Sequence, residues 1–411
     1  MKIAIIGAGP AGLLAAIASK NDDNQVVILE KNEKIGKKLF ITGKGRCNIT
    51  NYKPMREIMD QVVTNKKFLY SAFNSFTNED IIRLLNENGL ETKIERGDRV
   101  FPSSDKSSDV IKCFEKICRN KKIDIRLNSL VSYIEKRGEK FRIYSTHGLL
   151  EEADRLILAC GGRSYPSTGS TGDGHKFAAY FGHKIVSPKP GLVPILINDQ
   201  DLAGLGGISL KNISLNFKLK NKKYNFFGEL LFTGKGISGP VVLTASSYIN
   251  KNPEQVKDMH IDMKTALDYE TLDRRFIKEF EVNPNKQIST ILESLTLKAL
   301  IPIILDRLGI EKEKKAHQIS KKERANLVEI FKHFNLDFQA LMDIKYAIIT
   351  SGGLSVKEIN PSTMESKLVK GLYFAGEMID VDALTGGYNL QIAYSTGYLA
   401  GQNARDGGKD V

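Results

Sequence analysis

Cysteine and histidine are scarce in this chain of 411 residues. The four cysteines, Cys47, Cys113, Cys118 and Cys160, are too few and too scattered for the disulfide framework of a small secreted domain. The six histidines show no metal-ligand spacing, and no histidine lies close to the Cys113 and Cys118 pair. We therefore expect no disulfides and no metal site.

Long apolar runs are also missing. No run approaches the roughly 20 residues that a membrane-spanning helix needs, so we expect no membrane association. The hydrophobic fraction of 41% is typical of a globular protein. Met1 leads straight into an apolar segment without the pattern of a signal peptide, so we expect a cytoplasmic protein. A chain of this length is too large for one core and predicts two or three domains.

Acidic residues are outnumbered by basic ones, 48 to 60, which gives a formal net charge of +12. An excess of lysine and arginine favours anionic partners such as RNA, coenzyme A esters or an acidic surface. A lysine-rich but merely solvated surface would give the same composition. Charge alone leaves these readings open.

The first 30 residues contain a dinucleotide-binding pattern. An apolar strand at 2–6 runs into a glycine-rich turn at 7–12, a helix of small residues follows at 13–19, and a second strand at 25–29 ends at Glu30. This order of strand, turn, helix, strand and acid is typical of a Rossmann βαβ unit. We therefore expect a nucleotide cofactor.

Each residue of the turn has a mechanical task in such a unit. Gly7 allows the sharp turn, Gly9 allows close approach of a pyrophosphate, and Gly12 allows the helix to pack on the strand. Pro10 suits the first helical turn, where no N–H is needed. The helix N-terminus favours the phosphates, and Glu30 is placed to accept the ribose hydroxyls.

The segments that follow alternate between loops, helices and strands. We expect a basic loop at 31–55 and amphipathic helices at 68–89 and 107–120. Four strands are expected to form a small antiparallel layer, at 123–127, 129–136, 140–145 and 148–153. The run at 155–162 is expected to be a buried strand that leads into a turn at Gly161 and Gly162.

The composition changes after residue 190, which predicts an α/β fold with insertions. We expect a Rossmann-like nucleotide domain in two parts, 1–190 and 351–411. Between them we expect a small antiparallel β-barrel at 191–266, a helical insert at 267–335 and a return strand of the barrel at 336–350. The last apolar stretch is expected to be one strand over 338–350.

A second pair of strand-to-glycine segments, 156–162 and 372–377, favours FAD over NAD. In flavoproteins with two such elements, an acid after the last strand can accept a hydroxyl of the ribityl chain, a role that suits Glu377 beside Gly376. The helix beginning near Asn389 would direct its positive end at the flavin pyrimidine. Absence of a second Gly-x-Gly-x-x-Gly argues against a dedicated NAD(P)H domain, so NAD(P)H is expected only as a transient electron donor.

Four motifs together resemble the HI0933-like flavoprotein family. They lie at 39–51, containing Gly43-Lys44-Gly45-Arg46-Cys47-Asn48-Ile49-Thr50-Asn51, at 169–174, at 232–240, and at 375–377 with 386–389. The resemblance covers nearly the whole chain. One departure is Lys44, where the family often has a third glycine.

The resemblance implies FAD and an oxidoreductase that exchanges hydride at the flavin N5. Activities within the family are reduction of a uridine in ribosomal RNA to dihydrouridine, oxidation of aminoacetone, and desaturation of steroid-CoA esters. The positive charge favours ribosomal RNA as the partner. A small-amine oxidase that uses oxygen, a CoA-ester desaturase and a noncatalytic FAD-bound sensor remain the alternatives.

Two residues are candidates for proton transfer. Cys47 follows Arg46, and a neighbouring cation would lower the pKa of the thiol. Tyr388 is the second candidate, as proton donor or stacking ring, and for both residues plain packing is the alternative reading. Arg46 and Lys44 are expected to neutralise the pyrophosphate or a substrate phosphate.

Taken together, the chain predicts one set of cofactor contacts. These residues are Gly7, Gly9, Pro10, Ala11, Gly12, Glu30, Lys31, Lys38, Thr42, Gly45, Arg46, Cys47, Asn48, Val131, Ala159, Gly161, Gly376, Glu377, Gly387, Asn389 and Leu390. The cations of the helical insert are candidates for phosphate contacts with RNA, with a solvated helix face as the alternative reading; they are Lys312, Lys314, Lys315, Lys321, Lys322 and Arg324.

Overall fold

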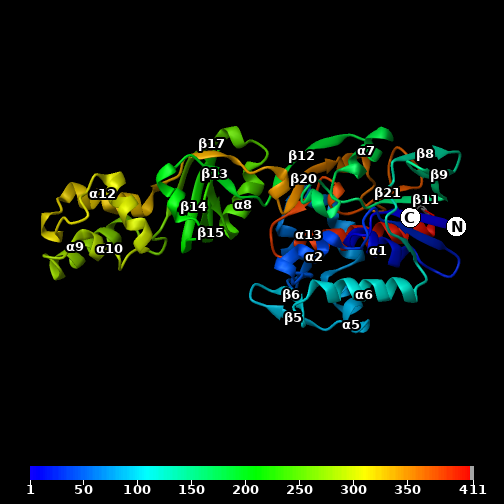
Figure 1. Cartoon of the computed structure of the whole chain (residues 1–411), viewed down its shortest axis with the longest axis horizontal. Helices are drawn as coiled ribbons and strands as arrows, with labels where there is room; N and C mark the ends of the chain where they lie inside the picture. The colour runs from blue at the N-terminus through cyan, green and yellow to red at the C-terminus, as the bar shows by residue number, and fades with distance from the viewer. Residues whose placement is uncertain (408–411) are drawn as a thin grey trace. The chain divides into compact units, whose positions relative to one another are not determined.

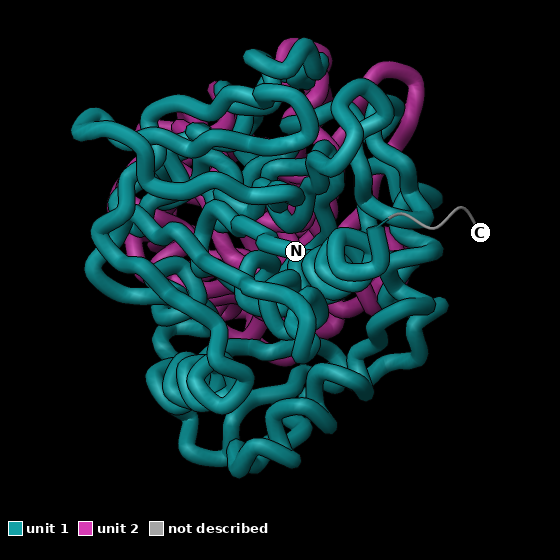
Figure 2. Tube along the Cα trace, turned by 90° about the vertical axis from the view of Figure 1, so that its right-hand side faces the viewer, with its two compact units in different colours: residues 1–191, 344–411 teal, residues 192–343 magenta. Residues whose placement is uncertain are grey.

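The computed structural model describes residues 1–407, and they fall into two compact units. One unit contains both ends of the chain, Met1–Gly191 and Ile344–Val411, and the other is Leu192–Asp343. Figure 2 shows the two units in different colours. Within the described residues, no helix has the length and apolar character needed to cross a membrane.

A five-stranded parallel sheet forms the centre of the first unit. Its order is β21 (Leu372–Phe374), β11 (Arg155–Leu158), β1 (Lys2–Ile6), β2 (Gln25–Leu29) and β7 (Asp124–Arg126). The β1 and β2 strands are almost wholly buried, as expected of a parallel sheet covered on both faces. This is a Rossmann-type α/β fold, and antiparallel sheets accompany it.

The prediction for residues 123–127 was wrong in its pairing. This segment, β7, pairs in parallel with β2 and does not join the antiparallel layer. Helix α6 (Ser107–Asn120) returns the chain to the same end of the sheet, so the next strand runs in the same direction as β2. The antiparallel layer holds three strands, β8 (Tyr133–Arg137), β9 (Lys140–Ser145) and β10 (Gly148–Ala153).

Two helices from opposite ends of the chain pack against each other, α1 (Pro10–Ser19) and α13 (Tyr388–Asp406) (Figure 1). A Cβ atom on Gly397 would lie 2.2 Å from the Ala11 carbonyl oxygen, and one on Gly401 would lie 2.2 Å from the Ala15 carbonyl oxygen. Only glycine permits this approach of the two backbones. The Ser19 hydroxyl also donates to the Gly401 carbonyl, at 3.2 Å.

Segments predicted as continuous are interrupted in the first unit. The expected helix at 68–89 breaks near Phe76, and Thr77 then caps the next helix through a reciprocal bond with Asp80. The basic segment 31–55 is more ordered than a loop and contains two short helices. The remaining elements of the unit are α2 (Lys37–Ile41), β3 (Thr50–Asn51), α3 (Met55–Asp60), β4 (Val62–Thr64), α4 (Tyr70–Ser75), α5 (Asn78–Glu87), β5 (Thr92–Glu95), β6 (Arg99–Pro102), α7 (Asp173–Tyr180), β12 (Ile185–Gly191), β20 (Ile349–Leu354) and β22 (Asp382–Ala383).

The second unit contains one antiparallel sheet of seven strands, in the order β18-β17-β14-β15-β16-β13-β19, with β18 and β19 at its ends. The seven strands are β13 (Ile195–Ile197), β14 (Ser209–Leu219), β15 (Lys222–Thr233), β16 (Gly236–Ser238), β17 (Val256–Asp262), β18 (Phe334–Asn335) and β19 (Phe338–Leu341). Closure of this sheet into the expected small barrel stays a prediction.

Five α-helices complete this unit. They are α8 (Pro240–Ile249), α9 (Tyr269–Val282), α10 (Ile288–Leu292), α11 (Ile301–Leu308) and α12 (Lys321–Lys332). Their apolar faces share one buried core with the sheet, which includes Leu272, Phe276 and Phe331. The single strand predicted at 338–350 is wrong. The chain forms β19 at 338–341, turns at Ile344–Tyr346, and then forms β20, which pairs with β12 in the first unit.

Candidate cofactor site

The turn between β1 and α1 has the geometry of a phosphate-binding loop. Gly7 has a φ of +104°, and a Cβ atom there would lie 2.5 Å from the Ala159 carbonyl oxygen. A Cβ atom on Gly12 would lie 1.9 Å from the Gly7 carbonyl oxygen. At Gly9, by contrast, a Cβ atom would have nothing within 4 Å. Packing therefore requires glycine at positions 7 and 12, whereas Gly9 leaves open space at the helix end.

Helices α1 and α13 both begin after a glycine, and neither has a side-chain cap among the described residues. Helix α1 begins after Gly9, with Pro10 in its first turn, and α13 begins after Gly387. A Cβ atom on Gly387, whose φ is +96°, would lie 2.5 Å from the Thr50 carbonyl carbon. Uncapped first-turn N–H groups and the positive end of the helix dipole favour a negative ligand. Both predicted helix ends therefore have the properties that a flavin dinucleotide needs.

Glu30 ends β2 and directs its carboxylate back at the glycine-rich turn. Its Oε2 accepts from the Ala8 N–H at 2.7 Å, and its Oε1 accepts from the backbone and side-chain amides of Asn32 at 2.8 and 2.7 Å. The residue is buried, with 7% of its surface exposed. These bonds fix the carboxylate beside the turn. Neighbouring Lys31 points elsewhere, to Asp173 at 2.6 Å and to the Thr171 hydroxyl.

Glu377 is held by three groups from distant parts of the sequence. Its Oε2 accepts from Lys38 Nζ at 2.6 Å, and its Oε1 accepts from the Ser164 hydroxyl at 2.9 Å and the Thr350 N–H at 2.8 Å. Burial by itself raises the pKa of this carboxyl, but the Lys38 charge and these hydrogen bonds outweigh it and hold the pKa below its ordinary value. The site therefore contains an ionised Glu377 at the end of β21.

Loop 42–48 follows an unusual left-handed path. Gly43, Lys44, Gly45 and Cys47 all have φ between +57° and +84°. Lys44 thus occupies the conformation that suits the glycine expected there, at a cost of about 1 kcal/mol. This path carries the Cys47 side chain inward and leaves the Lys44 side chain exposed.

Arg46 does not lower the pKa of the Cys47 thiol, which was one of the two readings of this residue. The residue is completely buried, and burial raises the pKa of its thiol to about 12. Arg46 does not offset this, because its guanidinium pairs with Glu95 and Asp105 and lies over the Phe101 ring. For the same reason Arg46 is not poised to neutralise a pyrophosphate in this conformation.

One buried polar atom next to Cys47 lacks a partner. Within the described residues, Asn48 Oδ1 is buried and accepts no hydrogen bond. A buried acceptor without a partner costs about 1–3 kcal/mol, so a donor from a bound molecule would be favourable here. Asn389, in contrast, is fully used, because its amide exchanges bonds with the Ala383 backbone and donates to Leu384.

The family model for the HI0933-like protein Rossmann domain matches residues 1–403. The chain belongs to the HI0933-like family. Relatives of full length agree with this. A ribosomal RNA dihydrouridine synthase of Haemophilus influenzae is 32% identical, over 96% of this chain and 96% of its own. A 3-dehydro-bile acid delta(4,6)-reductase of Clostridium scindens is 31% identical, over 98% of this chain and 99% of its own.

A solved structure supports the fold. The 3-ketosteroid-Δ4-(5α)-dehydrogenase of Rhodococcus jostii aligns with a TM-score of 0.51 and 13% identity, over 98% of this chain and 96% of its own. With its family and relatives, the HI0933-like chain is an FAD-dependent oxidoreductase.

The residues present fit FAD. Open space at Gly9 and the free end of α1 suit the pyrophosphate, Glu30 suits the adenosine ribose, and the orphaned Asn48 Oδ1 awaits a donor. The other predicted contacts belong to the same unit. Val131 and Ala159 are buried, Gly161 and Gly376 have positive φ, Thr42 bonds the Leu39 carbonyl, and Ala11 and Leu390 lie in the first turns of the two helices.

Sequence reasoning missed the partners of Glu377. Ser164 and Thr350 are separated by 186 positions, yet the Thr350 hydroxyl accepts from the Ser164 N–H at 3.1 Å. Single serine and threonine residues outside a motif carry no sequence signal. The Gly161-Gly162 turn was the only sequence feature that pointed to a close neighbour here. A Cβ atom on Gly162 would lie 2.2 Å from the Thr350 hydroxyl, so glycine is needed where Thr350 approaches.

Proposed function

We propose that this HI0933-like oxidoreductase reduces a uridine of ribosomal RNA to dihydrouridine. The observation that carries the proposal is the 32% identity with the H. influenzae ribosomal RNA dihydrouridine synthase along almost the full length of both chains. A second dihydrouridine synthase, from Escherichia coli, is 29% identical over 97% of this chain. The net charge of +12 suits a polyanionic substrate.

Reduction of uridine adds two electrons and two protons across the C5–C6 double bond. Bound FAD, once reduced by a donor such as NAD(P)H, would supply the hydride, and the protein must supply a proton to the other carbon. A tyrosine phenol is protonated at neutral pH, and burial raises the pKa of Tyr388 further. Tyr388 opens α13 and is 6% exposed, whereas Cys47 is completely buried. We therefore favour Tyr388 over Cys47 as the proton donor.

The cations that would hold RNA phosphates are exposed on the second unit. Lys220 and Lys223 flank the turn between β14 and β15, and Lys222 lies 5.0 Å from the centre of the Tyr224 ring. Two cations of the helical insert are already neutralised, since Lys314 pairs with Glu323 and Arg324 pairs with Asp273. Lys312, Lys315, Lys321 and Lys322 remain exposed there. RNA binding needs such contacts away from the reacting base.

The test has a genetic and a biochemical arm. Deletion of the gene should remove a dihydrouridine from ribosomal RNA, measured by mass spectrometry of nucleosides as the loss of the dihydrouridine signal. The purified, FAD-loaded protein, reduced with NAD(P)H or dithionite, should restore it on RNA from the deletion strain. An unchanged dihydrouridine content in the deletion strain would refute the proposal.

A second candidate rests on the 31% identity with the bile acid delta(4,6)-reductase. It is reduction of a carbon–carbon double bond conjugated to a ring carbonyl, in a small polycyclic substrate. Turnover with a 4,6-dien-3-one, together with no reaction on RNA, would favour it. Peroxide formation from a small amine would instead favour the oxidase alternative.

A further inference from the structure

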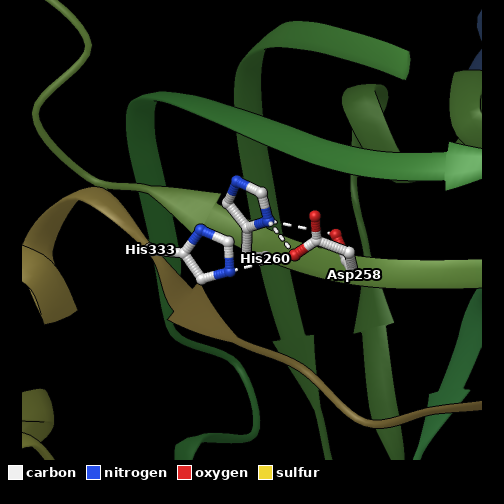
Figure 3. Close-up of side chains that lie close together, drawn as sticks. All are labelled: Asp258, His260 and His333. Carbon is white, nitrogen blue, oxygen red and sulfur yellow. Dashed lines mark hydrogen bonds and ion pairs between the residues drawn. The ribbon is translucent and has the colours of Figure 1, made fainter.

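Three side chains that are separated in sequence converge in the second unit. Asp258 and His260 come from β17, and His333 follows the last residue of α12 (Figure 3). Asp258 Oδ1 lies 3.3 Å from His260 Nδ1 and 3.0 Å from His333 Nε2, and His260 Nδ1 also lies 3.0 Å from the Asp258 carbonyl oxygen, a contact that a metal ion would replace. One donor atom from each residue lies within 4.8 Å of the other two. The two imidazole rings stack with centres 3.5 Å apart.

The backbone places these donors by specific irregularities. Asp258 has a φ of +55°, and the pairing of β17 with β14 shifts register between the partners of Asn216 and Lys218. Such a bulge redirects a side chain that a regular strand would point elsewhere. His333 leaves the helix at the C-cap, where its N–H still donates to Glu329 at 2.7 Å. The cluster therefore depends on local conformations that an ordinary sheet does not require.

The two separations from the carboxylate match those in a zinc site, and the stacked imidazoles would have to turn apart for both ring nitrogens to face one ion. Tetrahedral Zn²⁺ with bonds of about 2.0–2.1 Å to nitrogen and oxygen puts neighbouring donor atoms about 3.3 Å apart. The two measured separations from Asp258 Oδ1 are 3.3 and 3.0 Å. Two imidazoles with one carboxylate are a donor set that zinc prefers, and a fourth position stays open to water because Asp258 is exposed.

A fourth residue holds the carboxylate in position. Lys218 Nζ donates to Asp258 Oδ2 at 2.7 Å and leaves Oδ1 directed at the histidines. Such outer partners orient metal ligands in known sites. Lys218 belongs to β14, so the cluster joins two strands of the sheet to the end of a helix.

We propose that Asp258, His260 and His333 form a binding site for a divalent transition metal of the Zn²⁺ type. The ion would connect β17 to the end of α12 and thereby stabilise the second unit. All three ligands lie in the second unit, Leu192–Asp343, whereas the residues assigned to the cofactor lie in the first.

The test is calorimetric titration of the chelator-treated, FAD-loaded full chain with ZnCl₂. One Zn²⁺ per chain is expected to bind and to raise the melting temperature. His333→Ala and Asp258→Asn should abolish this binding, and Lys218→Met should weaken it about tenfold, the low end for outer partners. His317→Ala is the matched control, because His317 is an exposed histidine of the same unit whose Nδ1 lies 2.8 Å from the Pro284 carbonyl.

Fold integrity is checked separately, so that loss of binding is not mistaken for unfolding. Without zinc, each variant should melt close to the native protein and retain its flavin absorbance. Absence of stoichiometric zinc binding by the native chain would overturn the proposal. So would equal affinity in the native protein and in His333→Ala, since an ion elsewhere on the surface would then account for the heat.

Discussion

At the scale of single residues, Glu377 shows how neighbours decide what a carboxylate does. The position of this acid after a strand and a glycine could be read from the sequence. Its ionisation could not, because it depends on Lys38, Ser164 and Thr350, which the fold brings together from three other segments. Cys47 is the opposite case, because its neighbours raise a pKa that the sequence predicted to be low. A neighbouring arginine predicted a low thiol pKa, but the arginine turns to two acids and burial raises that pKa.

Lys38→Met is expected to destabilise the protein in a pH-dependent manner. Removing the cation leaves the Glu377 carboxylate uncompensated, at a cost of about 2 kcal/mol at pH 7, between the values for exposed and buried pairs. In the native protein the pKa of Glu377 is below its ordinary value of about 4.3. Its ionised form therefore stabilises the folded state at pH values above about 4.3, and this stabilisation is lost as the pH falls through the lower pKa of the folded state. The difference between native and variant should therefore be largest near pH 7 and should shrink as the pH falls below about 4.3 and through the folded-state pKa.

Urea unfolding across this pH range measures the effect. The adjacent Lys37→Met is the control, because Lys37 pairs at 3.2 Å with the exposed Glu33 and should cost under about 0.5 kcal/mol. A loss for Lys38→Met that stays constant with pH would show that the carboxylate is not its cause.

Tyr388→Phe is expected to lower turnover about 100-fold while the FAD content is unchanged, because it removes the proposed proton donor and little volume. Cys47→Ala should leave turnover near the native rate, since its thiol is buried and bonded within loop 42–48. The rates of both variants are measured in single-turnover experiments, as the rate at which substrate oxidises the reduced flavin. The opposite order of effects would transfer the proton step to Cys47.

At the scale of elements, local patterns predicted what local interactions decide. The helix at 107–120 and the strands at 140–145 and 148–153 have the predicted bounds, because their apolar spacing alone separates a buried from an exposed face. The run 338–350 was misread, because its apolar residues divide between two sheets. Partners distant in sequence make that division.

Gly401→Ala is expected to destabilise the protein by about 2 kcal/mol or more, because its Cβ atom would lie 2.2 Å from the Ala15 carbonyl oxygen and would force α1 and α13 apart. Thermal unfolding should show this loss. Gly204→Ala serves as the control, since a Cβ atom there would have nothing within 4 Å. A neutral Gly401→Ala would mean that the two helices separate without cost, which contradicts their close packing.

At the scale of the whole molecule, the sequence predicted the cofactor half better than the rest. The glycine-rich turn, Glu30 and the N-terminus of α13 are each local motifs. The Rossmann arrangement brings such motifs together around one dinucleotide, which is why together they predict FAD. The histidine cluster could not be predicted, because His260 and His333 are 73 positions apart and a bulge at Asp258 orients their shared carboxylate. The histidines show no metal-ligand spacing along the sequence, and the fold brings two of them together with Asp258.

The positive charge of the molecule leads to the last prediction. If RNA is the substrate, its affinity should fall steeply with salt, because each neutralised phosphate releases counterions. Lys220→Ala with Lys223→Ala should lower the slope of log affinity against log salt by about two, about one for each lost phosphate contact. Lys112→Ala with Lys121→Ala removes the same charge from α6 and its C-cap and should leave that slope unchanged. Equal slopes for the two double variants would show that net charge, and not the β14–β15 turn, holds the RNA.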